Sequence, residues 1–501
     1  MRILFAIPPL KSVIKPPIRG VPMGVLYLSS YLKKYWQGKS ELIINILDIP
    51  RKSMSFYQAS CKIHEFAPDI IAISSKHPDS SGAHKLAEIA KSINKNCVTI
   101  IGGPYATGEK EHALEKDPFM DFSAVGEGEQ VFLEFLEAVE SRKKFEDVKG
   151  LIYRKNGKVC FSGAREPISD IESIPYPDWE LLDIEDYFSE NDSAQNAGQV
   201  EKRVMPVVGS RGCPYSCIYC HNIFGKKLRL RTPEDIAAEV SMIVKRYQIR
   251  EIEFYDDLFN LDLNRAKKLC GLIIEKKLNI RIAFPNGLRA DRMDEELVDK
   301  LIEAGTYRIW YAIESGSPRI QKTINKNLDL KKTQDMIAFT SKKKAIMVCG
   351  FFMTGFPDET EEDLKMTMDF AKKSMLHGAY FFFVTPYPGS AMFEQALKRK
   401  PELKNTTWRE FLVMSANISS MSDKRLMKLT YKAARRFYLS PKRAWLNFMK
   451  ILEGRPVNWR LFFRNIARVI DILIFPEPIM GHSPKNKDIL PETPKSFQTS
   501  R

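Results

Sequence analysis

The chain has 501 residues, of which 44% are hydrophobic and 28% charged, and this balance excludes an intrinsically disordered protein. No apolar run reaches the roughly 18 to 20 residues that a membrane-spanning helix requires. The formal net charge of +15 favours an anionic partner, which could be a nucleic acid, an anionic lipid surface or an acidic molecule.

Residues 1–145 alternate short β-rich runs with helical patterns, which predicts a doubly wound parallel sheet in an α/β domain. We expect its strands at 2–7, 42–49, 69–75, 97–103 and 122–129. We interpret the opening run as a buried strand rather than a signal peptide, because no small-residue cleavage site follows it. Ligands of such sheets bind at the carboxyl ends of the strands, although glycines there are more often plain turn residues.

Residues 146–195 contain a hairpin signal followed by a segment rich in proline and acidic residues. The hairpin is "GLIYRKNGKVCF", and Asn156-Gly157 is typical of its two-residue turn. We expect the acidic segment that follows to be a linker between domains.

Residues 196–400 repeat a strand and then a helix six times, which predicts a partial (β/α)6 parallel barrel. The expected strands are 204–210, 251–257, 280–286, 308–314, 346–355 and 380–388. Polar residues and glycines follow these strands at their carboxyl ends. In a barrel of this kind, that rim is where ligands bind.

Residues 401–482 form a basic region with helical patterns, and we expect the polar tail 483–501 to be disordered. Between Lys424 and Arg468 there are thirteen Lys or Arg residues and one acidic residue, Glu453. Residues 460–475 place apolar side chains on one helical face and arginines on another. Such a helix either docks on an anionic membrane surface or packs on its own domain with a solvated charged side, and the second reading is favoured. No recognised nucleic-acid-binding module accompanies the charge, so we expect no nucleic acid partner.

Three of the eight cysteines fall within "GCPYSCIYCHN" at residues 212–222, on the loop after the first barrel strand. Their spacing is Cys213-x3-Cys217-x2-Cys220, with Tyr219 before the last thiol. Structural zinc prefers four protein ligands, and His221 is poorly placed to join in because it directly follows Cys220. Three thiolates on a [4Fe–4S] cluster would leave one iron open to another ligand. The other five cysteines are scattered singly, which is typical of a protein from a reducing cytoplasm.

This motif resembles that of the radical S-adenosylmethionine (SAM) enzymes. The resemblance implies that Cys213, Cys217 and Cys220 bind three irons of a [4Fe–4S] cluster while SAM chelates the fourth. It also implies that reduction of the cluster cleaves SAM to a 5′-deoxyadenosyl radical.

The resemblance extends around the barrel rim, through "FYDDLFN", "FPNGLRAD", "AIESGS", "GFFMTGFPDET" and "TPYPGS". It implies that SAM is bound by Tyr219, Asp256, Asn286, Glu314, Ser315 and Gly355. A carboxylate at the end of a strand is usually a helix N-cap, so capping remains the alternative for Asp256, Asp257 and Glu314.

The N-terminal region resembles the cobalamin-binding, Rossmann-like domain that often precedes this barrel. Its glycine signature is "IIGGPYATG", and "AISSKHPDSSG" and "AVGEGE" follow neighbouring strands. The resemblance implies that cobalamin is bound by Ser74, Ser75, Gly102, Gly103, Gly126 and Glu127. The alternative is a degenerate domain that has lost cobalamin binding.

The sequence lacks histidine at two places where the cobalamin-binding pattern has it, the loop after the first strand and position 105. The loop after the first strand, "IPPLKSVIKPPIRGVPMG", carries no histidine that could ligate cobalt. His77 follows the wrong strand for that role, so we predict a surface histidine or one that contacts the nucleotide tail. Tyr105 stands where relatives often carry histidine.

These resemblances predict a cytoplasmic, cobalamin-dependent radical SAM enzyme that methylates an unactivated carbon. The alternatives are a radical cyclisation, rearrangement or oxidation, or, in another class, a zinc-stabilised protein that binds membrane or RNA. We expect a reductant such as flavodoxin or ferredoxin and a substrate that is lipid-like or anionic. The basic C-terminal region could also make peripheral membrane contact.

Overall fold

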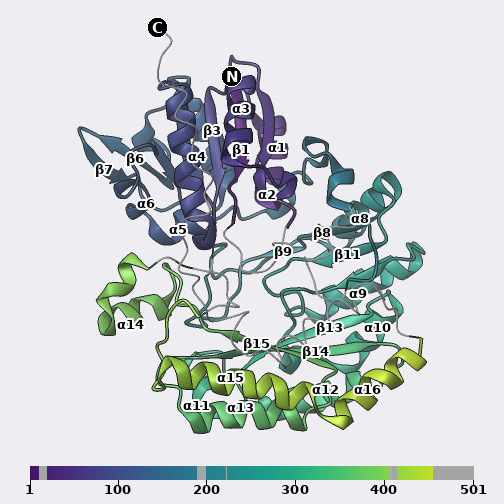
Figure 1. Ribbon diagram of the computed structural model, residues 1–501. Helices are drawn as coiled ribbons and strands as arrows, with labels where there is room; N and C mark the ends of the chain where they lie inside the picture. Colours follow the sequence, from purple (N-terminus) through teal and green to yellow (C-terminus); the bar gives the residue numbers. More distant parts are fainter. Residues whose placement is uncertain (11–19, 189–198, 222, 407, 409–413, 455–501) are drawn as a thin grey trace. The chain divides into compact units, whose positions relative to one another are not determined.

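The computed structural model describes residues 1–10, 20–188, 199–221, 223–406, 408 and 414–454 (Figure 1). Within these ranges the chain forms two compact units. The first comprises Met1–Arg165 and Pro177–Asp183, and the second comprises Glu166–Tyr176 and the described residues from Ile184 onward. The predicted helix at 460–475 and the predicted disordered tail at 483–501 lie outside the described residues.

A seven-stranded sheet in the order β2-β1-β3-β4-β5-β6-β7 forms the first unit. The strands β1 to β5 run parallel, and β6 and β7 join antiparallel. The strands are Arg2–Ile7 (β1), Ile43–Asp48 (β2), Ile70–Ser74 (β3), Val98–Gly102 (β4), Phe122–Ala124 (β5), Leu151–Lys155 (β6) and Lys158–Phe161 (β7). The helices are Met23–Tyr35 (α1), Ile49–Lys52 (α2), Phe56–Phe66 (α3), Ser80–Ile93 (α4), Pro104–Glu109 (α5), His112–Glu115 (α6) and Gly128–Val139 (α7).

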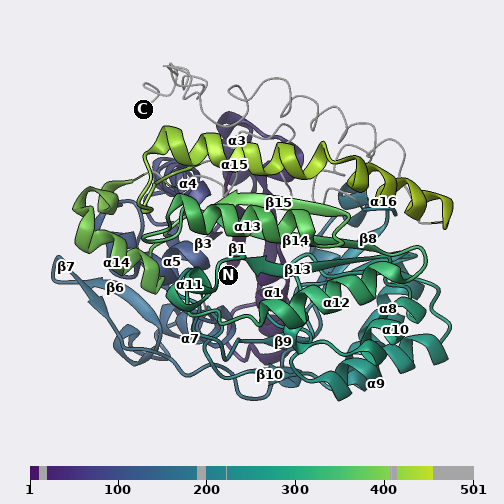
Figure 2. The same ribbon diagram turned by 90° about the horizontal axis from the view of Figure 1, so that it is seen from below.

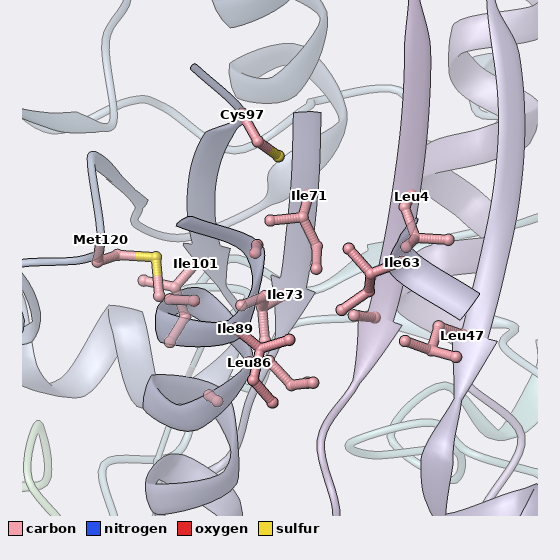
Figure 3. Close-up of a cluster of buried hydrophobic side chains, with 14 of the residues drawn as sticks. Leu4, Leu47, Ile63, Ile71, Ile73, Leu86, Ile89, Cys97, Ile101 and Met120 are labelled. Carbon is pink, nitrogen blue, oxygen red and sulfur yellow. The ribbon is translucent and has the colours of Figure 1, made fainter. Parts of the chain in front are cut away.

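Helices cover both faces of this sheet, because successive side chains of a strand point to opposite faces. Ile3 and Phe5 of β1 belong to a buried cluster with residues of α1 and α7. On the other face, Leu4, Ile71 and Ile73 pack with residues of α3 and α4 (Figure 3). The predicted doubly wound parallel sheet is thereby confirmed.

Strand order reverses between β1 and β3, since β2 lies beside β1 and β4 lies beside β3. Ligands of doubly wound sheets bind outside the carboxyl ends of the strands at such a reversal. Ser74 ends β3 at this edge, and Gly102 ends the neighbouring β4. Strand β5 is shorter than expected, because Gly126 has a φ of 84° and α7 begins at Gly128.

The hairpin expected between the domains is instead part of the first sheet. Asn156 and Gly157 both have positive φ, 51° and 75°, as the predicted two-residue turn requires. Leu151 of β6 pairs antiparallel with Ala124 of β5, so the hairpin covers an edge of the parallel sheet. The first compact unit therefore extends to Arg165, beyond the boundary at residue 145 that the sequence suggested.

The second unit contains two three-stranded parallel sheets, in the orders β12-β11-β8 and β13-β14-β15. Isolated parallel bridges from Ile282 to Thr306 and from Leu288 to Tyr311 connect the two. The six strands thus follow one another in chain order as the predicted partial barrel. They are Val204–Val207 (β8), Glu251–Phe254 (β11), Arg281–Ala283 (β12), Arg308–Glu314 (β13), Met347–Thr354 (β14) and Gly378–Phe383 (β15).

Helices follow the barrel strands, and two further strands are only two residues long. Those strands are Ser210–Arg211 (β9) and Arg229–Leu230 (β10). The helices are Pro233–Tyr247 (α8), Leu263–Glu275 (α9), Glu295–Glu303 (α10), Pro318–Thr323 (α11), Leu330–Lys342 (α12), Glu361–Lys373 (α13) and Ala391–Arg399 (α14).

The described part of the basic C-terminal region is helical, as predicted. It contains α15, Asp423–Tyr438, and α16, Pro441–Leu452. Helix α15 runs beside β15 and α13 (Figure 2), and it buries Leu426 and Phe437. Among the described helices, none is both long and apolar enough to cross a bilayer.

Candidate functional site

The loop that carries the three cysteines starts and ends on a two-residue antiparallel ladder. Ser210 pairs with Leu230 and Arg211 pairs with Arg229, so β9 and β10 close the base of the loop. Gly212 follows with a φ of 89°, and a Cβ at this position would lie 2.4 Å from the carbonyl oxygen of Lys227. Only glycine fits there, because backbone atoms on the opposite side of the loop come so close.

The three thiols lie close enough to influence one another's ionisation. Cys213 and Cys217 are partly buried, and Cys220 is exposed as a residue while its sulfur atom is desolvated by the protein. Desolvation by the surrounding protein, followed by the nearby Cys217, Asp257 and Cys213, raises the pKa of Cys220 to about 12. Desolvation also raises the pKa of Cys213. A metal cation reverses this effect, because it deprotonates a coordinating thiol.

The donor set of the loop fits an iron–sulfur cluster. Among the described residues, no three His, Cys, Asp or Glu side chains converge on a single metal ion. Convergence on one point is needed for one ion, whereas each thiolate of a cluster binds a different iron. Three thiols on a short loop with a fixed base can each bind one iron of a cluster, whereas a structural zinc takes four protein ligands.

Two consecutive aspartates after β11 hold the start of this loop. Asp256 is buried, and its two carboxylate oxygens accept hydrogen bonds from the Gly209 amide (3.0 Å) and the Ser210 hydroxyl (2.6 Å). Desolvation raises the pKa of Asp256, although Arg265 opposes that effect. The neighbouring Asp257 accepts a hydrogen bond from the amide of Gly212 at 3.1 Å.

The sequence offered both aspartates, and Asp256 was the one predicted to bind SAM, but Asp257 is the carboxylate that acts on the thiols. Asp257 is exposed and acts on the ionisation of Cys213 and Cys220, whereas Asp256 is occupied with the loop base. Asn286, after β12, is tied to the same place, because its side-chain amide donates to the carbonyls of Tyr255 (3.0 Å) and Asp256 (3.2 Å).

Glu314 ends β13 in a strained conformation, with a φ of 67° directly after a register shift in the β13–β14 ladder. Its carboxylate is buried and accepts a hydrogen bond from Lys326 Nζ at 3.1 Å. The same ammonium donates to the Tyr219 hydroxyl at 3.3 Å. Lys326 therefore connects two of the predicted SAM-binding residues, one on the cysteine loop and one at a strand end.

Sequence reasoning missed Lys326. It lies between Asn325 and Asn327, which have φ values of 52° and 48°. An Asn-x-Asn pair in the left-handed region marks a loop with a constrained backbone, and this was the signal that could have drawn attention to the lysine. Its carbonyl oxygen also accepts a hydrogen bond from Arg289, whose guanidinium lies over the Tyr215 ring.

Ser315 and Gly355 make contacts within the protein. The Ser315 hydroxyl lies 3.0 Å from that of Thr367 on α13 and is fully buried. The Gly355 amide donates to Glu359 at 2.6 Å, and its φ of 92° requires a glycine. Desolvation raises the pKa of Glu359 to about 8 in spite of this hydrogen bond.

In the first unit, the predicted cobalamin-binding residues gather at the carboxyl edge of the sheet. The Ser75 amide donates to the Gly102 carbonyl at 3.0 Å, and the Ser75 hydroxyl donates to Asp79 at 2.7 Å. Gly103 has a φ of 90°, and a Cβ there would lie 2.9 Å from the Ser75 carbonyl oxygen. The loops after β3 and β4 are thus packed against each other, immediately beyond Ser74.

Open space borders two glycines of this edge. A Cβ built on Gly102 or on Gly126 would meet no atom within 4 Å. The Gly126 amide donates to the Thr107 hydroxyl at 3.1 Å, which joins the loop after β5 to α5. Glu127, the next residue, is buried at the start of α7. Glycine backbone that borders open space along this edge fits the close approach of a large planar cofactor such as cobalamin.

Of the two roles predicted for His77, the surface position is wrong, and the contact with the nucleotide tail stays a prediction. A 3-10 turn at His77–Asp79 turns the side chain inward, and only 4% of the residue is exposed. Its ring packs edge-on against Tyr105 at a centroid distance of 5.6 Å. Tyr105 in turn lies 3.0 Å from His84 Nε2, and His84 Nδ1 contacts Asp117 at 2.5 Å. The buried rings of His77 and Tyr105 and the half-buried ring of His84 pack beneath the loops that carry the glycines.

Two family models match the chain. The radical SAM superfamily model matches residues 207–371, and the B12 binding domain model matches residues 13–136. The first match spans the cysteine loop and the barrel strands β11 to β14, and the second covers the parallel strands β2 to β5 and the helices between them.

The chain is also similar, over most of its length, to known proteins. The chain is 33% identical over 448 residues to an uncharacterized methyltransferase, PH0819, of Pyrococcus horikoshii, which covers 88% of this chain and 93% of the relative. It is 27% identical over 439 residues to an anaerobic magnesium-protoporphyrin IX monomethyl ester cyclase of Rubrivivax gelatinosus, which covers 87% and 76%. The fold is similar to that of the radical SAM methyltransferase TsrM from Kitasatospora setae, solved with cobalamin and a [4Fe–4S] cluster, with a TM-score of 0.64 at 15% identity over 79% of this chain and 75% of that one.

A doubly wound domain followed by a partial barrel with a three-cysteine loop defines a cobalamin-dependent radical SAM enzyme. The chain belongs to the B12-binding radical SAM enzymes, a family that includes methyltransferases and cyclases. The cofactors typical of this family are a [4Fe–4S] cluster, SAM and cobalamin, and its radical chemistry requires a reductant.

Proposed function

We propose that this enzyme methylates an unactivated carbon of its substrate. The observation that carries the proposal is the three-cysteine loop with its fixed base on β9 and β10, present in one chain with an open glycine edge that fits cobalamin. Identity of 33% to a methyltransferase supports methyl transfer.

When bound, the cluster supplies the electron that cleaves SAM to methionine and a 5′-deoxyadenosyl radical, and cobalamin supplies the methyl group that replaces a substrate hydrogen. Cys213, Cys217 and Cys220 hold the cluster in this proposal. Tyr219, Asp256, Asn286, Glu314, Ser315 and Gly355 form the SAM site.

These residues contribute to SAM binding in different ways. The side chains of Asp256 and Ser315 are already hydrogen bonded within the protein, so they shape the backbone around the ligand. Lys326 fixes the Glu314 carboxylate and the Tyr219 ring relative to each other. A site held in this way orients its ligand without reorganisation.

At the other cofactor, Gly102 and Gly126 admit close approach, while Ser75 and Gly103 hold the loops after β3 and β4 against each other. Ser74 and Glu127 complete the proposed cobalamin site. The reductant in this proposal is a flavodoxin or a ferredoxin. The net charge of +15 favours an anionic or lipid-like substrate.

Anaerobic purification and reconstitution test the cluster. We expect a brown protein with about four irons and four sulfides per chain, and 5′-deoxyadenosine when SAM and dithionite are added. The variant C213A/C217A/C220A should lose iron, sulfide and SAM cleavage, whereas the control C61A/C160A should keep all three. A colourless zinc protein, or SAM cleavage by the triple variant, would contradict the proposal.

A radical cyclisation or oxidation is the second candidate, favoured by the 27% identity to the cyclase over 87% of this chain. The two candidates differ in how they use SAM. A methyltransferase demethylates one SAM to S-adenosylhomocysteine for each SAM that it cleaves, whereas a cyclase needs no demethylation. We expect cobalamin-dependent formation of S-adenosylhomocysteine from SAM, and its absence from a cobalamin-loaded, SAM-cleaving enzyme would favour the cyclase.

A further inference from the structure

The C-terminal helices leave a group of large apolar side chains on the surface. Leu439, Trp445, Phe448 and Leu452 are 64%, 61%, 51% and 63% exposed. They make up half of the large apolar side chains that the described residues expose. Trp445, Phe448 and Leu452 are three to four residues apart on α16, so they share one face of the helix. We call these four side chains the apolar patch.

Helix α16 is attached to the protein by its polar side. Arg443 and Lys450 are only 2% and 4% exposed. The Arg443 guanidinium donates to the carbonyls of Ala371 and Ser374, both at 3.1 Å, at the end of α13. Lys450 Nζ donates to the Lys343 carbonyl at 2.6 Å, at the end of α12. Cations suit these positions because the C-terminal end of a helix carries partial negative charge.

This arrangement reverses the usual orientation of an amphipathic helix, which buries its apolar side. Turning Trp445 and Phe448 inward would expose the two polar anchors and break their hydrogen bonds. The apolar patch therefore faces away from the barrel as a consequence of how α16 is anchored, and a further partner is needed to remove it from water.

Cations accompany the apolar patch. Lys428, Lys432 and Arg436 follow one another at four-residue spacing along α15, and all three are exposed. Exposed Lys442 is three residues before Trp445, and Arg436 is three residues before Leu439. None of these four cations has an acidic partner among the described residues. Apolar side chains and uncompensated positive charge thus occupy the same two helices.

We propose that this surface docks on the headgroup region of an anionic lipid bilayer. Tryptophan and phenylalanine insert favourably at the boundary between headgroups and acyl chains. Lysine and arginine beside them are attracted to anionic headgroups. A protein partner of ordinary composition would need a row of acids opposite α15, whereas an anionic membrane supplies the charge and the apolar layer together. The binding is peripheral, since no described helix can span a bilayer.

Co-sedimentation of the full-length protein with vesicles tests the proposal. Vesicles of phosphatidylglycerol and phosphatidylcholine should bind the protein at least tenfold more tightly than vesicles of phosphatidylcholine alone, and high salt should reduce the difference. W445E/F448E should weaken binding to the anionic vesicles at least tenfold. K428E/K432E should weaken it too, and the matched control Y57E, which changes an exposed aromatic side chain of α3, should not.

Thermal unfolding and the mass in solution show whether the apolar patch is covered by another part of the protein or by a second copy instead of by lipid. The proposal requires W445E/F448E to melt at the same temperature as the parent and to keep its mass, because the substituted side chains are exposed. A marked loss of thermal stability would mean that residues 455–501 cover the apolar patch, and a change from dimer to monomer would mean that a second copy covers it. Either result, or equal binding to both kinds of vesicle, would overturn the proposal.

Discussion

Lys326 Nζ lies 3.1 Å from Glu314 Oε1, and both side chains are buried at the carboxyl end of β13. A third group, the Tyr219 hydroxyl, accepts from the same ammonium. Desolvating two charges costs several kcal/mol, and only the mutual attraction and hydrogen bonds of a well-placed pair offset that cost. The pair is therefore sensitive to the loss of either partner.

Replacing the lysine alone should be costly. K326M leaves the Glu314 carboxylate buried without compensation, and we expect the free energy of unfolding to fall by about 3 kcal/mol. Urea denaturation measures this, with K331M as the matched control, because Lys331 pairs with Asp335 on the surface at 2.7 Å. The control should lose less than about 0.5 kcal/mol. In the double variant K326M/E314Q part of the stability should return, and equal losses in K326M and K331M would contradict the ion pair.

Gly212 should be essential for the cysteine loop. G212A places a Cβ where the Lys227 carbonyl lies, and we expect the loop to be displaced and the iron content after reconstitution to fall at least several-fold. G157A is the matched control, because Gly157 also has positive φ but a Cβ there meets nothing within 4 Å. It should cost only the backbone strain of about 1 kcal/mol. Full iron content in G212A would show that the loop tolerates the displacement.

Two adjacent glycines at the cobalamin edge should respond differently. G103A combines a φ of 90° with a contact of 2.9 Å to the Ser75 carbonyl oxygen, so we expect a loss of about 1–3 kcal/mol in the free energy of unfolding. G102A should change stability by less than about 0.5 kcal/mol, because its Cβ faces open space. Chemical denaturation measures the free energy of unfolding of both variants. Equal losses in G103A and G102A would mean that the loop after β4 is not packed on the loop after β3.

Stability should fall as pH rises through neutrality. Glu251 is fully buried, accepts a hydrogen bond from the Tyr307 hydroxyl at 2.5 Å, and lies near Glu253 and Arg308. Desolvation and then Glu253 raise its pKa from the ordinary value of 4.5 to about 7. Between these values the folded chain keeps a proton that the unfolded chain has released, so the free energy of unfolding decreases with pH. This contribution is complete below the unfolded pKa and is lost as pH rises through the folded one.

E251Q should remove that part of the pH dependence. Urea unfolding at about pH 5 and about pH 8 should give a smaller difference for E251Q than for the parent. The control E275Q changes an exposed glutamate near the end of α9 and should behave like the parent. If E251Q and the parent lost stability equally between the two pH values, Glu251 would not be the group that titrates.

Much of the fold follows from local sequence, because buried parallel strands are nearly continuous apolar runs. Residues 2–7 and 69–75 are apolar runs of this kind, and Asn156-Gly157 is a recognisable signal for a two-residue hairpin turn. The partner of that hairpin was not predictable in the same way. Pairing of β6 with β5 depends on which sheet edge is free, and no residue within the hairpin carries that information.

The site was less predictable than the fold, for a similar reason. The three cysteines are close in sequence and could be recognised together. Asp256 could not be assigned, because its partners Gly209 and Ser210 are 47 and 46 residues away. Lys326 reaches Glu314 only because α11 and the backbone conformation at Glu314 bring the two side chains together. His77 is buried by a short 3-10 turn, and no periodic pattern in the sequence predicts that turn.

Because α16 is attached through polar contacts, we expect this helix to unfold locally more easily than the barrel. Arg443 and Lys450 are its buried residues, so little apolar surface is gained when the helix docks. Elements with few buried apolar contacts open locally at a small fraction of the global unfolding free energy. The amide hydrogens of α16 should therefore exchange with solvent deuterium much faster than those of β13 and β14. We expect the end of the described chain to detach and re-dock while the barrel remains folded.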